Sequence, residues 1–379
     1  MKISAKDINA IQTIIRKLDD TESKDIYIYR LLYSLTNDIR YIYDMIGDLV
    51  HKNQKDIIKK SEEAQSKFQL YNVCDLYSFL LKSLKDSDGN IIIFGAGDVG
   101  KKVLYWLRSV GFTPKAFCDN LSKISNTYIE NCPVISTDVL EKEYNRSIII
   151  IATYKYHAEI RKQLSGLNIS QNLVYEYEHN CLLSYWGNPY FEDDLLQPDE
   201  NEIFIDAGAF CGETAEEFAA WCPSYKKIYS FEPDKINFEK LSCNISKKNI
   251  RDTILINAGL WNENKTLYFT RGGDDGTGSY VKDTGTDEVK VVSLDTFLDG
   301  EPATYIKMDI EGSEKEALKG ARKTIQKYKP KLAICLYHKP EDIIILPQYL
   351  LELVPEYQFK IRHYTTFSYD TILYAYVKR

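Results

Sequence analysis

Three features that mark common protein classes are missing from this sequence. It has no lysine- or arginine-rich stripe to neutralise phosphates, and its net charge is −7 over 379 residues, which argues against a nucleic-acid partner. The longest apolar runs, such as residues 148–152, are far shorter than a membrane span. Residues 1–8 are charged and lack the apolar core of a signal peptide. We therefore expect a cytoplasmic protein with no transmembrane segment.

Cysteine pairs at Cys-x-x-Cys spacing are also absent. The eight cysteines are scattered and lie mostly in apolar segments, so we expect reduced core residues. With 44% hydrophobic and 27% charged residues, the composition is that of a globular protein. A chain of this length suits two domains, each with its own core.

A strand that ends in a glycine turn is the most informative feature present. Residues 203–214 read IFIDAGAFCGET, and residues 228–234 read IYSFEPD. Gly208 and Gly212 can take positive φ and allow a close backbone approach. Glu232 ends the second strand, where an acidic side chain can accept hydrogen bonds from both ribose hydroxyls. This pair of motifs predicts a nucleotide-cofactor site.

Further motifs downstream make the prediction more specific. Residues 305–321 read YIKMDIEGSEKEALKGA, and residues 329–338 read KPKLAICLYH. Together with the two motifs above, these resemble the FkbM family of S-adenosylmethionine-dependent O-methyltransferases over roughly residues 200–376. The tail from Tyr364 to Tyr374 is similar to the closing strands of that family.

The resemblance implies a class I methyltransferase fold over residues 201–379, with S-adenosylmethionine as cofactor. Strands and helices alternate in this half of the sequence, which indicates a mostly parallel sheet with helices on both faces. We expect strands at 203–206, 227–231, 253–257, 304–308 and 331–337, a strand pair within 265–292, and helices at 212–221, 235–247 and 314–327. The expected cofactor-binding residues are Asp206, Gly208, Gly212, Glu213, Thr214, Glu232, Asn257 and Ala258.

Three side chains at strand ends are the candidate catalytic residues: Asp309, Glu311 and His338. A hydroxyl is a poor nucleophile, so methyl transfer to it needs a base. The unperturbed pKa of histidine suits that role near neutrality. Asp309 and Glu311 are also a candidate Mg²⁺ site. The alternatives are a helix cap at Glu311–Glu314, with Ser313 near the capping position, and a structural histidine. Lys307 can point to the opposite face of its strand and pair with an acid.

Residues 1–85 show apolar positions at helical spacing and almost no glycine or proline. They predict a helical region of several segments. Its charge-rich stretch at 52–67 reads as a solvated helix face, although a dimerising helical hairpin would look the same. Homo-oligomerisation through this region is therefore one expectation.

Residues 86–178 form a second predicted α/β module. The run IIIFGAGDVG at 91–100 contains Gly95, Gly97 and Gly100 between a buried strand and a helix, and Asp119 ends the next strand. With a third strand at 147–152, we expect about half of a full dinucleotide-binding fold. The module resembles the nucleotide-sugar-binding domains attached to some bacterial glycan-modifying enzymes. The alternative is that the glycines serve only tight strand-to-helix packing.

Two connecting segments complete the sequence. Residues 179–200 read as a linker, and the glycine-rich stretch at 271–280 reads as a hairpin loop or a lid over the acceptor. The hypothesis is an O-methyltransferase that acts on a hydroxyl of a sugar, glycan or nucleotide-linked glycan precursor. The alternatives are a non-catalytic nucleotide-binding sensor and an NAD-dependent sugar oxidoreductase that uses Gly95–Gly100.

Overall fold

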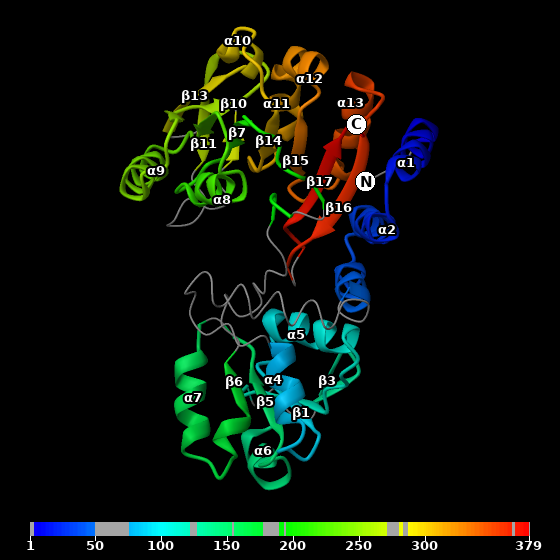
Figure 1. Cartoon of the computed structure of the whole chain (residues 1–379). Coiled ribbons are helices and arrows are strands. Elements are labelled where there is room, and N and C mark those ends of the chain that lie inside the picture. The colour runs from blue at the N-terminus through cyan, green and yellow to red at the C-terminus, as the bar shows by residue number, and fades with distance from the viewer. Residues whose placement is uncertain are drawn as a thin grey trace. The chain divides into compact units, whose positions relative to one another are not determined.

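The structure is a computed structural model, and it describes residues 4–49, 76–121, 127–153, 155–176, 189–192, 195–270, 280–282, 287–365 and 368–378. The chain divides into two compact units. One comprises Met1–Asn37, Asn188–His363 and Tyr369–Arg379, and the other comprises Asp38–Gly187 and Tyr364–Ser368. Both are α/β units with mostly parallel sheets, as the sequence predicts (Figure 1).

A seven-stranded sheet forms the centre of the first unit, in the order β16-β17-β15-β14-β7-β8-β9. Its strands are β7 (Ile203–Ala207), β8 (Lys227–Phe231), β9 (Thr253–Ile256), β14 (Tyr305–Met308), β15 (Lys331–Cys335), β16 (Gln358–His363) and β17 (Thr371–Tyr376). The first five run parallel, whereas β17 is antiparallel to both β15 and β16. Strand β7 is apolar except for Asp206, and every residue of it is buried.

The order of the strands reverses between β7 and β14. The chain builds β8 and β9 on one side of β7, and β14 and β15 on the other. In open α/β sheets, ligands bind at the carboxyl ends of the strands at such a reversal. The expected ligand site therefore lies where β7 and β14 end, at Gly208 and Asp309.

Among the described residues, this unit contains eight helices: α1 (Ala5–Lys17), α2 (Thr21–Thr36), α8 (Glu213–Trp221), α9 (Lys235–Lys248), α10 (Leu294–Leu298), α11 (Glu314–Gly320), α12 (Arg322–Tyr328) and α13 (Asp342–Leu353). Their ends follow the sequence. The Asp234 side chain caps α9 by accepting from the Asn237 amide, and Asn249 ends it in the left-handed conformation. Helix α1 starts with a capping box between Ser4 and Asp7.

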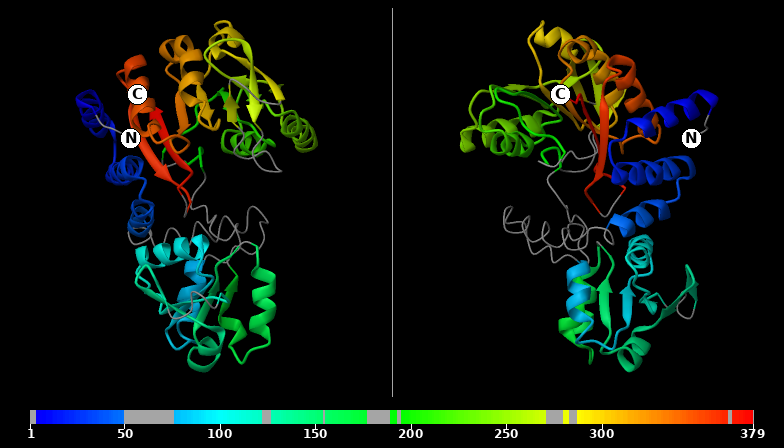
Figure 2. Two further views of the ribbon diagram at one scale, coloured as in Figure 1. Left: turned by 180° about the vertical axis from the view of Figure 1, so that it is seen from behind. Right: turned by 45° about the vertical axis from the view of Figure 1, so that its right-hand side comes forward.

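The two N-terminal helices belong to the same unit as the large sheet. Helix α2 packs on β16 and α1 packs on α13, although these segments lie more than 300 residues apart in the sequence (Figure 2). Arg362 of β16 pairs with Asp20 at 3.0 Å, and the Asp19 amide donates to the Phe359 carbonyl. The helices predicted for the first 49 residues are confirmed, and a further helix covers 40–49. Residues 50–75, which hold the charge-rich stretch, lie outside the described residues.

An aromatic cluster fills the core beside β7 and β14. Phe191 lies with its ring centroid 5.6 to 6.0 Å from those of Phe204, Phe218, Trp221 and Tyr305. Phe204 stacks on Phe218 at 4.2 Å. Buried aromatic pairs add roughly 0.5–1.5 kcal/mol each beyond their burial. The cluster anchors the segment before β7 to the sheet, and this anchoring positions Tyr190.

A four-stranded sheet is inserted between β9 and β14, in the order β10-β13-β11-β12. It consists of β10 (Gly259–Leu260), β11 (Lys265–Thr270), β12 (Tyr280–Lys282) and β13 (Asp287–Val292). The strand pair expected within 265–292 is therefore present, with one additional strand. The predicted lid at 271–280 lies outside the described residues except for Tyr280.

The second unit contains a six-stranded sheet in the order β3-β4-β2-β1-β5-β6. Its elements are α4 (Leu76–Ser83), β1 (Ile91–Phe94), α5 (Asp98–Ser109), β2 (Ala116–Cys118), β3 (Tyr128–Ile129), β4 (Cys132–Ile135), α6 (Thr137–Glu143), β5 (Ile148–Ile151), α7 (His157–Ser165), a 3-10 turn (Gln171–Leu173) and β6 (Val174–Glu176). All pairs are parallel except β3 with β4. The expectation of half a fold with three strands is wrong, because β4, β6 and the short β3 extend the sheet.

Two predicted elements end differently in the structure. The helix expected at 314–327 is broken at Ala321 into α11 and α12. At this point Gly320 packs so closely on the Trp261 carbonyl that an added Cβ would lie 1.9 Å from it. The strand expected at 331–337 ends at Cys335, which leaves Tyr337 and His338 in the loop that follows β15.

Candidate functional site

A buried ion pair lies at the reversal point of the large sheet. Lys307 of β14 and Asp206 of β7 are register partners, with Nζ 3.2 Å from Oδ1. Lys307 is 2% exposed and Asp206 is fully buried. Lys307 also donates to the Gly208 carbonyl at 2.7 Å. The prediction that Lys307 pairs with an acid is thus confirmed. Burial raises the pKa of Asp206 even though Lys307 opposes this, and its Oδ2 has no hydrogen-bond partner among the described residues.

The turn after β7 requires glycine. Gly208 has φ +80°, and a Cβ there would lie 1.9 Å from the Asp309 carbonyl oxygen. This close contact brings the ends of β7 and β14 together. Gly212 has φ +97°, and a Cβ there would meet Leu241 at 2.9 Å. Both positive φ values match the prediction. The atoms that an added Cβ would meet at these two glycines belong to other residues of the protein.

Glu232 lies at the end of β8, where the sequence places a ribose-binding acid. Its two carboxylate oxygens accept from the amides of Phe210 and Asp234, each at 2.9 Å. Glu232 is 6% exposed, and burial raises its pKa to about 7. Phe210 adopts the left-handed conformation with φ 46°. The carboxylate therefore holds the turn after β7 beside the end of β8.

The remaining predicted cofactor residues surround these two strand ends. Asn257 follows β9 and donates from its side chain to the Glu232 carbonyl at 2.9 Å, and Ala258 beside it is 4% exposed. Glu213 and Thr214 form the first turn of α8, where Glu213 is exposed and Thr214 half-buried. The structure thus brings all of the predicted cofactor residues to one edge of the sheet.

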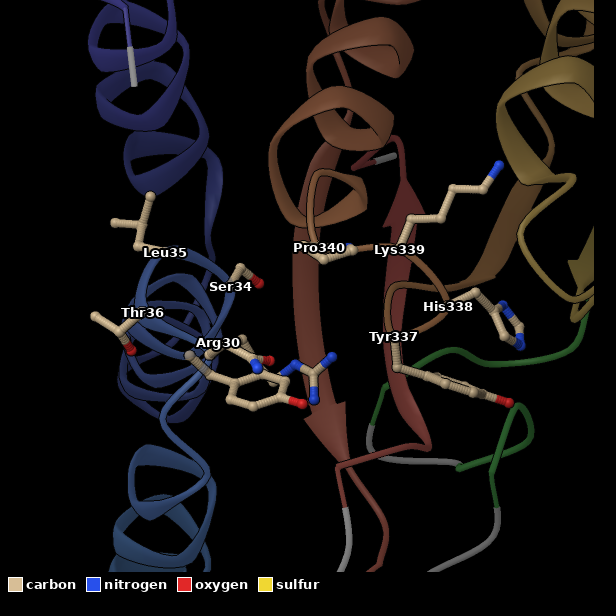
Figure 3. Close-up of a pocket in the computed structure, with 10 residues that line it drawn as sticks. Arg30, Ser34, Leu35, Thr36, Tyr337, His338, Lys339 and Pro340 are labelled. Atoms are coloured by element: carbon tan, nitrogen blue, oxygen red, sulfur yellow. The ribbon is translucent and has the colours of Figure 1, made fainter. Parts of the chain in front are cut away.

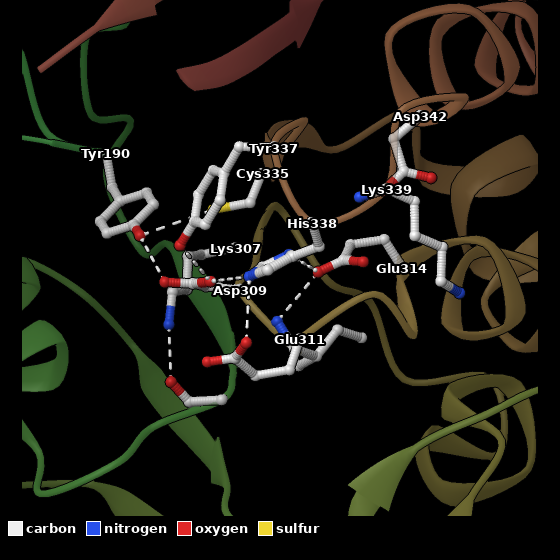
Figure 4. Close-up of polar contacts among 12 residues, drawn as sticks. Tyr190, Lys307, Asp309, Glu311, Glu314, Cys335, Tyr337, His338, Lys339 and Asp342 are labelled. Carbon is white, nitrogen blue, oxygen red and sulfur yellow. Dashed lines mark hydrogen bonds and ion pairs between the residues drawn. The ribbon is translucent and has the colours of Figure 1, made fainter. Parts of the chain in front are cut away.

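Asp309 is the centre of a hydrogen-bonded cluster at the end of β14 (Figure 4). Its Oδ2 accepts from the Tyr190 hydroxyl and its Oδ1 from the Tyr337 hydroxyl, each at 3.0 Å. Burial alone would raise the pKa of Asp309, but Lys307, His338 and the two hydroxyls together hold it below its ordinary value. Asp309 is therefore ionised at neutral pH.

Tyr190 was not predicted as a site residue. Its amide donates to the Tyr374 hydroxyl at 2.9 Å, the Tyr305 hydroxyl donates to its carbonyl, and Lys307 Nζ lies 5.3 Å from its ring centroid. It adopts φ 73°, a rare conformation for a non-glycine residue. The sequence carries no signal for this residue, because contacts from β14 and β17 set its position.

His338 contacts three carboxylates. Its Nδ1 lies 2.9 Å from Glu314 Oε1, and its Nε2 lies 3.4 Å from Asp309 Oδ1 and 3.5 Å from Glu311 Oε2. Burial works against a charged imidazole, but these carboxylates raise the pKa of His338 to about 9. The expectation of an ordinary histidine pKa is therefore wrong, because His338 is protonated at neutral pH in the absence of ligands.

Glu314 holds the far side of the His338 ring. Its Oε1 also accepts from the Ile310 amide at 3.0 Å, and its side chain is 1% exposed. Ser313 occupies the N-cap position of α11 but makes no side-chain capping bond, so the simple helix-cap alternative does not describe this turn. Glu311, at φ 53°, leads into Gly312 at φ 87°. This left-handed pair turns the Glu311 carboxylate toward His338.

The Mg²⁺ site suggested for Asp309 and Glu311 gains no support. Across the described part of the chain, no group of three or more His, Cys, Asp or Glu side chains is placed to hold a metal ion. Both carboxylates instead face the same nitrogen of His338.

The glycine motif of the second unit is explained mostly by packing. A Cβ at Gly95 would lie 2.7 Å from the Ala152 carbonyl oxygen, and one at Gly100 would lie 1.9 Å from the Gly95 carbonyl oxygen, whereas Gly97 faces open space. Asp119 accepts from the amides of Ala96 and Leu121 at 2.8 and 2.9 Å. The loop is thus held by its own chain, and nucleotide binding at Gly95, Gly97, Gly100 and Asp119 stays a prediction.

Among the described residues, no helix combines the length and the apolar character needed to cross a bilayer.

Solved structures similar to this chain include several methyltransferases. A methyltransferase FkbM from Methylobacillus flagellatus is 20% identical, with a TM-score of 0.47, over 85% of this chain and 99% of that one. An rRNA methylase from Streptococcus thermophilus is 19% identical, with a TM-score of 0.33, over 49% and 91%. A Streptococcus mutans methyltransferase structure in complex with SAH is 15% identical, with a TM-score of 0.31, over 49% and 94%.

Sequence comparison matches two separate parts of the chain to two different family models. No curated protein gives a significant match. Residues 87–175 match the family model described as C2185-like, N-terminal. Residues 206–361, which hold every predicted cofactor and catalytic residue of the large sheet, match the family model described as Methyltransferase FkbM domain.

Proposed function

We propose that the chain is an S-adenosylmethionine-dependent O-methyltransferase that acts on a hydroxyl of a sugar, glycan or nucleotide-linked glycan precursor. The observation that carries this proposal is the position of His338. Its Nε2 faces Asp309 at the reversal point of the sheet, and its Nδ1 is held by the buried Glu314. A histidine fixed on one nitrogen by a carboxylate is a common arrangement for general-base catalysis.

The residues at the ends of β7 and β8 fit the cofactor. Glu232 would hold the ribose, since each carboxylate oxygen accepts only one amide hydrogen bond and keeps further acceptor capacity. Asp206 and the Gly208 turn would flank the methionine end. The buried Asp206 Oδ2 still lacks a donor among the described residues, and a buried acceptor of this kind calls for a partner.

S-adenosylmethionine supplies an electrophilic methyl group on a sulfonium. In the proposed reaction, the acceptor oxygen forms a bond to the methyl carbon as the carbon–sulfur bond breaks, and the hydroxyl proton passes to Nε2 of His338. The chain must therefore align the hydroxyl and accept its proton.

The charged neighbours of His338 prepare it for this step. Glu314 fixes the ring through Nδ1, and Asp309 and Glu311 stabilise the imidazolium that forms at the Nε2 side. The sulfonium of a bound S-adenosylmethionine would bring a second positive charge near the cluster. Such a charge disfavours the protonated imidazole and lowers the pKa of His338. We propose that His338 becomes a competent base only in the cofactor complex.

The acceptor class is supported by the polar character of the cluster. The Tyr190 and Tyr337 hydroxyls, the imidazole and two carboxylates converge within a few residues of the strand ends. Such groups match the many hydroxyls of a sugar. The net charge of −7 supports a glycan over a nucleic acid.

The test is transfer of a labelled methyl group from S-adenosylmethionine to a panel of sugars, glycans and nucleotide sugars, with SAH release as a second readout. We expect His338→Gln to lower kcat by about 100-fold or more while SAH affinity stays unchanged. His157→Gln, a change on α7 of the second unit, is the matched control. Full activity in His338→Gln would contradict the proposed role of this residue.

A further inference from the structure

A pocket of about 310 Å³ lies beside the Asp309 cluster within the first unit. The last turns of α2 form one wall, from Arg30 to Asn37, and residues 337–340 after β15 form the other (Figure 3). Tyr337 and His338 thus belong both to the pocket wall and to the Asp309 cluster, and their side chains point from the wall toward that cluster. These two residues separate the pocket from Asp309.

The pocket contains a buried positive charge. Arg30 is 3% exposed, and its guanidinium points from α2 toward the 337–340 loop (Figure 3). Burial lowers the pKa of Arg30 to about 10, so it remains protonated at neutral pH. A guanidinium carries five N–H donors, so one that already has partners in the protein can still attract and bind a carboxylate or phosphate, and such charge-assisted bonds strengthen where water is excluded.

The rest of the wall suits a polyhydroxylated molecule. Ser34 lines the pocket with a hydroxyl, the Thr36 hydroxyl donates to the Leu32 carbonyl at 2.8 Å, and Asn37 ends α2 in the left-handed conformation at φ 56°. The Leu32 and Tyr33 carbonyls already accept from the Thr36 hydroxyl and the Asn37 amide, and the later carbonyls of the last turn have no donor within the helix. Sugar hydroxyls can donate to such carbonyls, while Leu35 and Pro340 offer apolar surface.

The order of sites along the edge of the sheet assigns the pocket to the acceptor. Glu232 ends β8, Asp309 ends β14, and His338 follows β15, next to the pocket. The pocket therefore lies on the opposite side of Asp309 from the proposed ribose site. We infer that it binds an anionic substituent of the acceptor, a carboxylate or a phosphate, several atoms away from the hydroxyl that receives the methyl group. This inference rests on the proposed function, which defines the acceptor.

The test is calorimetric titration of the full chain, with and without saturating SAH, using glucuronate, glucose 1-phosphate and neutral methyl glucoside. We expect at least one anion to bind about 10-fold more tightly than methyl glucoside, the gain typical of one charge-assisted contact. Arg30→Met should remove this preference, and Arg16→Met, an exposed arginine on α1, should keep it. The difference between the two anions identifies carboxylate or phosphate as the group that is bound.

A second variant, Thr36→Glu, keeps the test decisive if Arg30→Met does not fold. Thr36 lines the pocket and is exposed, so Thr36→Glu should fold and weaken anion binding by about 3- to 10-fold through like-charge repulsion. Thr36→Gln, of similar size but neutral, should bind like the wild type.

Several outcomes would overturn the inference: equal binding of methyl glucoside, no binding of either anion, or unchanged anion affinity in both Arg30→Met and Thr36→Glu. SAH binding separates this failure from that of the proposed function. If SAH binds and the anions do not, the acceptor assignment falls alone. If SAH does not bind, the proposed function fails, and the assignment of the pocket to a methyl acceptor fails with it.

Discussion

Nδ1 of His338 lies 2.9 Å from Oε1 of Glu314, and the side chains are only 7% and 1% exposed. A buried imidazole and carboxylate at this distance each stabilise the ionised form of the other, because water does not screen their attraction. This contact is the main attraction that opposes burial and raises the pKa of His338 to about 9. It links the stability of the domain to the chemistry proposed for it.

The raised pKa predicts a pH-dependent contribution to stability. A histidine has a pKa near 6.5 in the unfolded chain and about 9 here, so folding favours its protonated form. The stabilisation is fully present below about pH 6.5 and is lost as pH rises through about 9. It amounts to at most about 3 kcal/mol. Denaturant unfolding of wild type and His338→Gln at pH 6 and pH 10 measures it, and the difference between the two proteins should shrink at the higher pH. A constant difference would contradict the raised pKa.

Glu314→Gln should shift the titration of His338 to lower pH. The change removes the buried negative charge beside His338 but keeps an oxygen that can accept from the Ile310 amide. We expect the pKa of His338 to fall toward its ordinary value, and any pH–rate profile that depends on it to shift to lower pH. NMR titration of the His338 ring protons measures the shift. Glu316→Gln, at a half-buried position of the same helix where the carboxylate pairs with Lys319 and not with His338, is the control and should leave the titration in place.

The two tyrosine hydroxyls on Asp309 should each contribute to its position and charge. Tyr190→Phe and Tyr337→Phe each remove one 3.0 Å hydrogen bond, which should raise the pKa of Asp309 and cost about 1 kcal/mol of stability. Methyl transfer should fall by about 10-fold in each variant. Tyr225→Phe provides the matched control, because its hydroxyl donates to the Arg251 carbonyl instead. Activity equal to wild type in both site variants would exclude a role for these hydroxyls.

Removal of Lys307 should be strongly destabilising. Lys307→Met leaves the fully buried Asp206 without its cation, and an uncompensated buried charge costs about 3–5 kcal/mol. The double variant Lys307→Met with Asp206→Asn should recover part of this loss, because it removes the charge that is left behind. Chemical denaturation of the two variants gives both values. Equal stability of Lys307→Met and wild type would contradict the importance of the pair.

Gly208 and Gly97, which follow strands of the two different sheets, should respond very differently to substitution by alanine. Gly208→Ala places a Cβ 1.9 Å from the Asp309 carbonyl oxygen at a positive φ, whereas Gly97→Ala meets no atom within 4 Å. We expect a loss of more than about 2 kcal/mol at Gly208 and a change within about 0.5 kcal/mol at Gly97. Thermal unfolding of both variants gives the comparison. A large loss at Gly97 would show that its surroundings are tighter than the structure indicates.

The sequence predicted the parallel sheet and the strand ends well, because apolar strands followed by Gly208, Glu232 and Asp309 carry strong local signals. The pairing of Lys307 with an acid also followed from strand alternation. The position of Tyr190 could not be predicted, since Tyr305, Tyr374 and the aromatic cluster around Phe191 set it from distant parts of the chain.

The pKa of His338 and the pocket at Arg30 were equally out of reach of the sequence. The histidine titrates near 9 because three carboxylates converge on it, and Arg30 reaches the site only because α2 packs on β16. Both depend on contacts between segments that are far apart in the chain, which no local pattern records.

The central claim is that the ends of β7 and β8 bind S-adenosylmethionine, and titration of the purified protein with SAH tests it most directly. Glu232→Ala removes the acid proposed to hold the ribose. Glu301→Ala is the control, because Glu301 is exposed and contacts Lys227 and Tyr229 of β8 and not the turn after β7. We predict that wild type and Glu301→Ala bind SAH with similar affinity and that Glu232→Ala loses about 100-fold or more, as expected when a charged hydrogen-bonding partner is removed. No binding by wild type, or equal binding by Glu232→Ala, would contradict the assignment of this site.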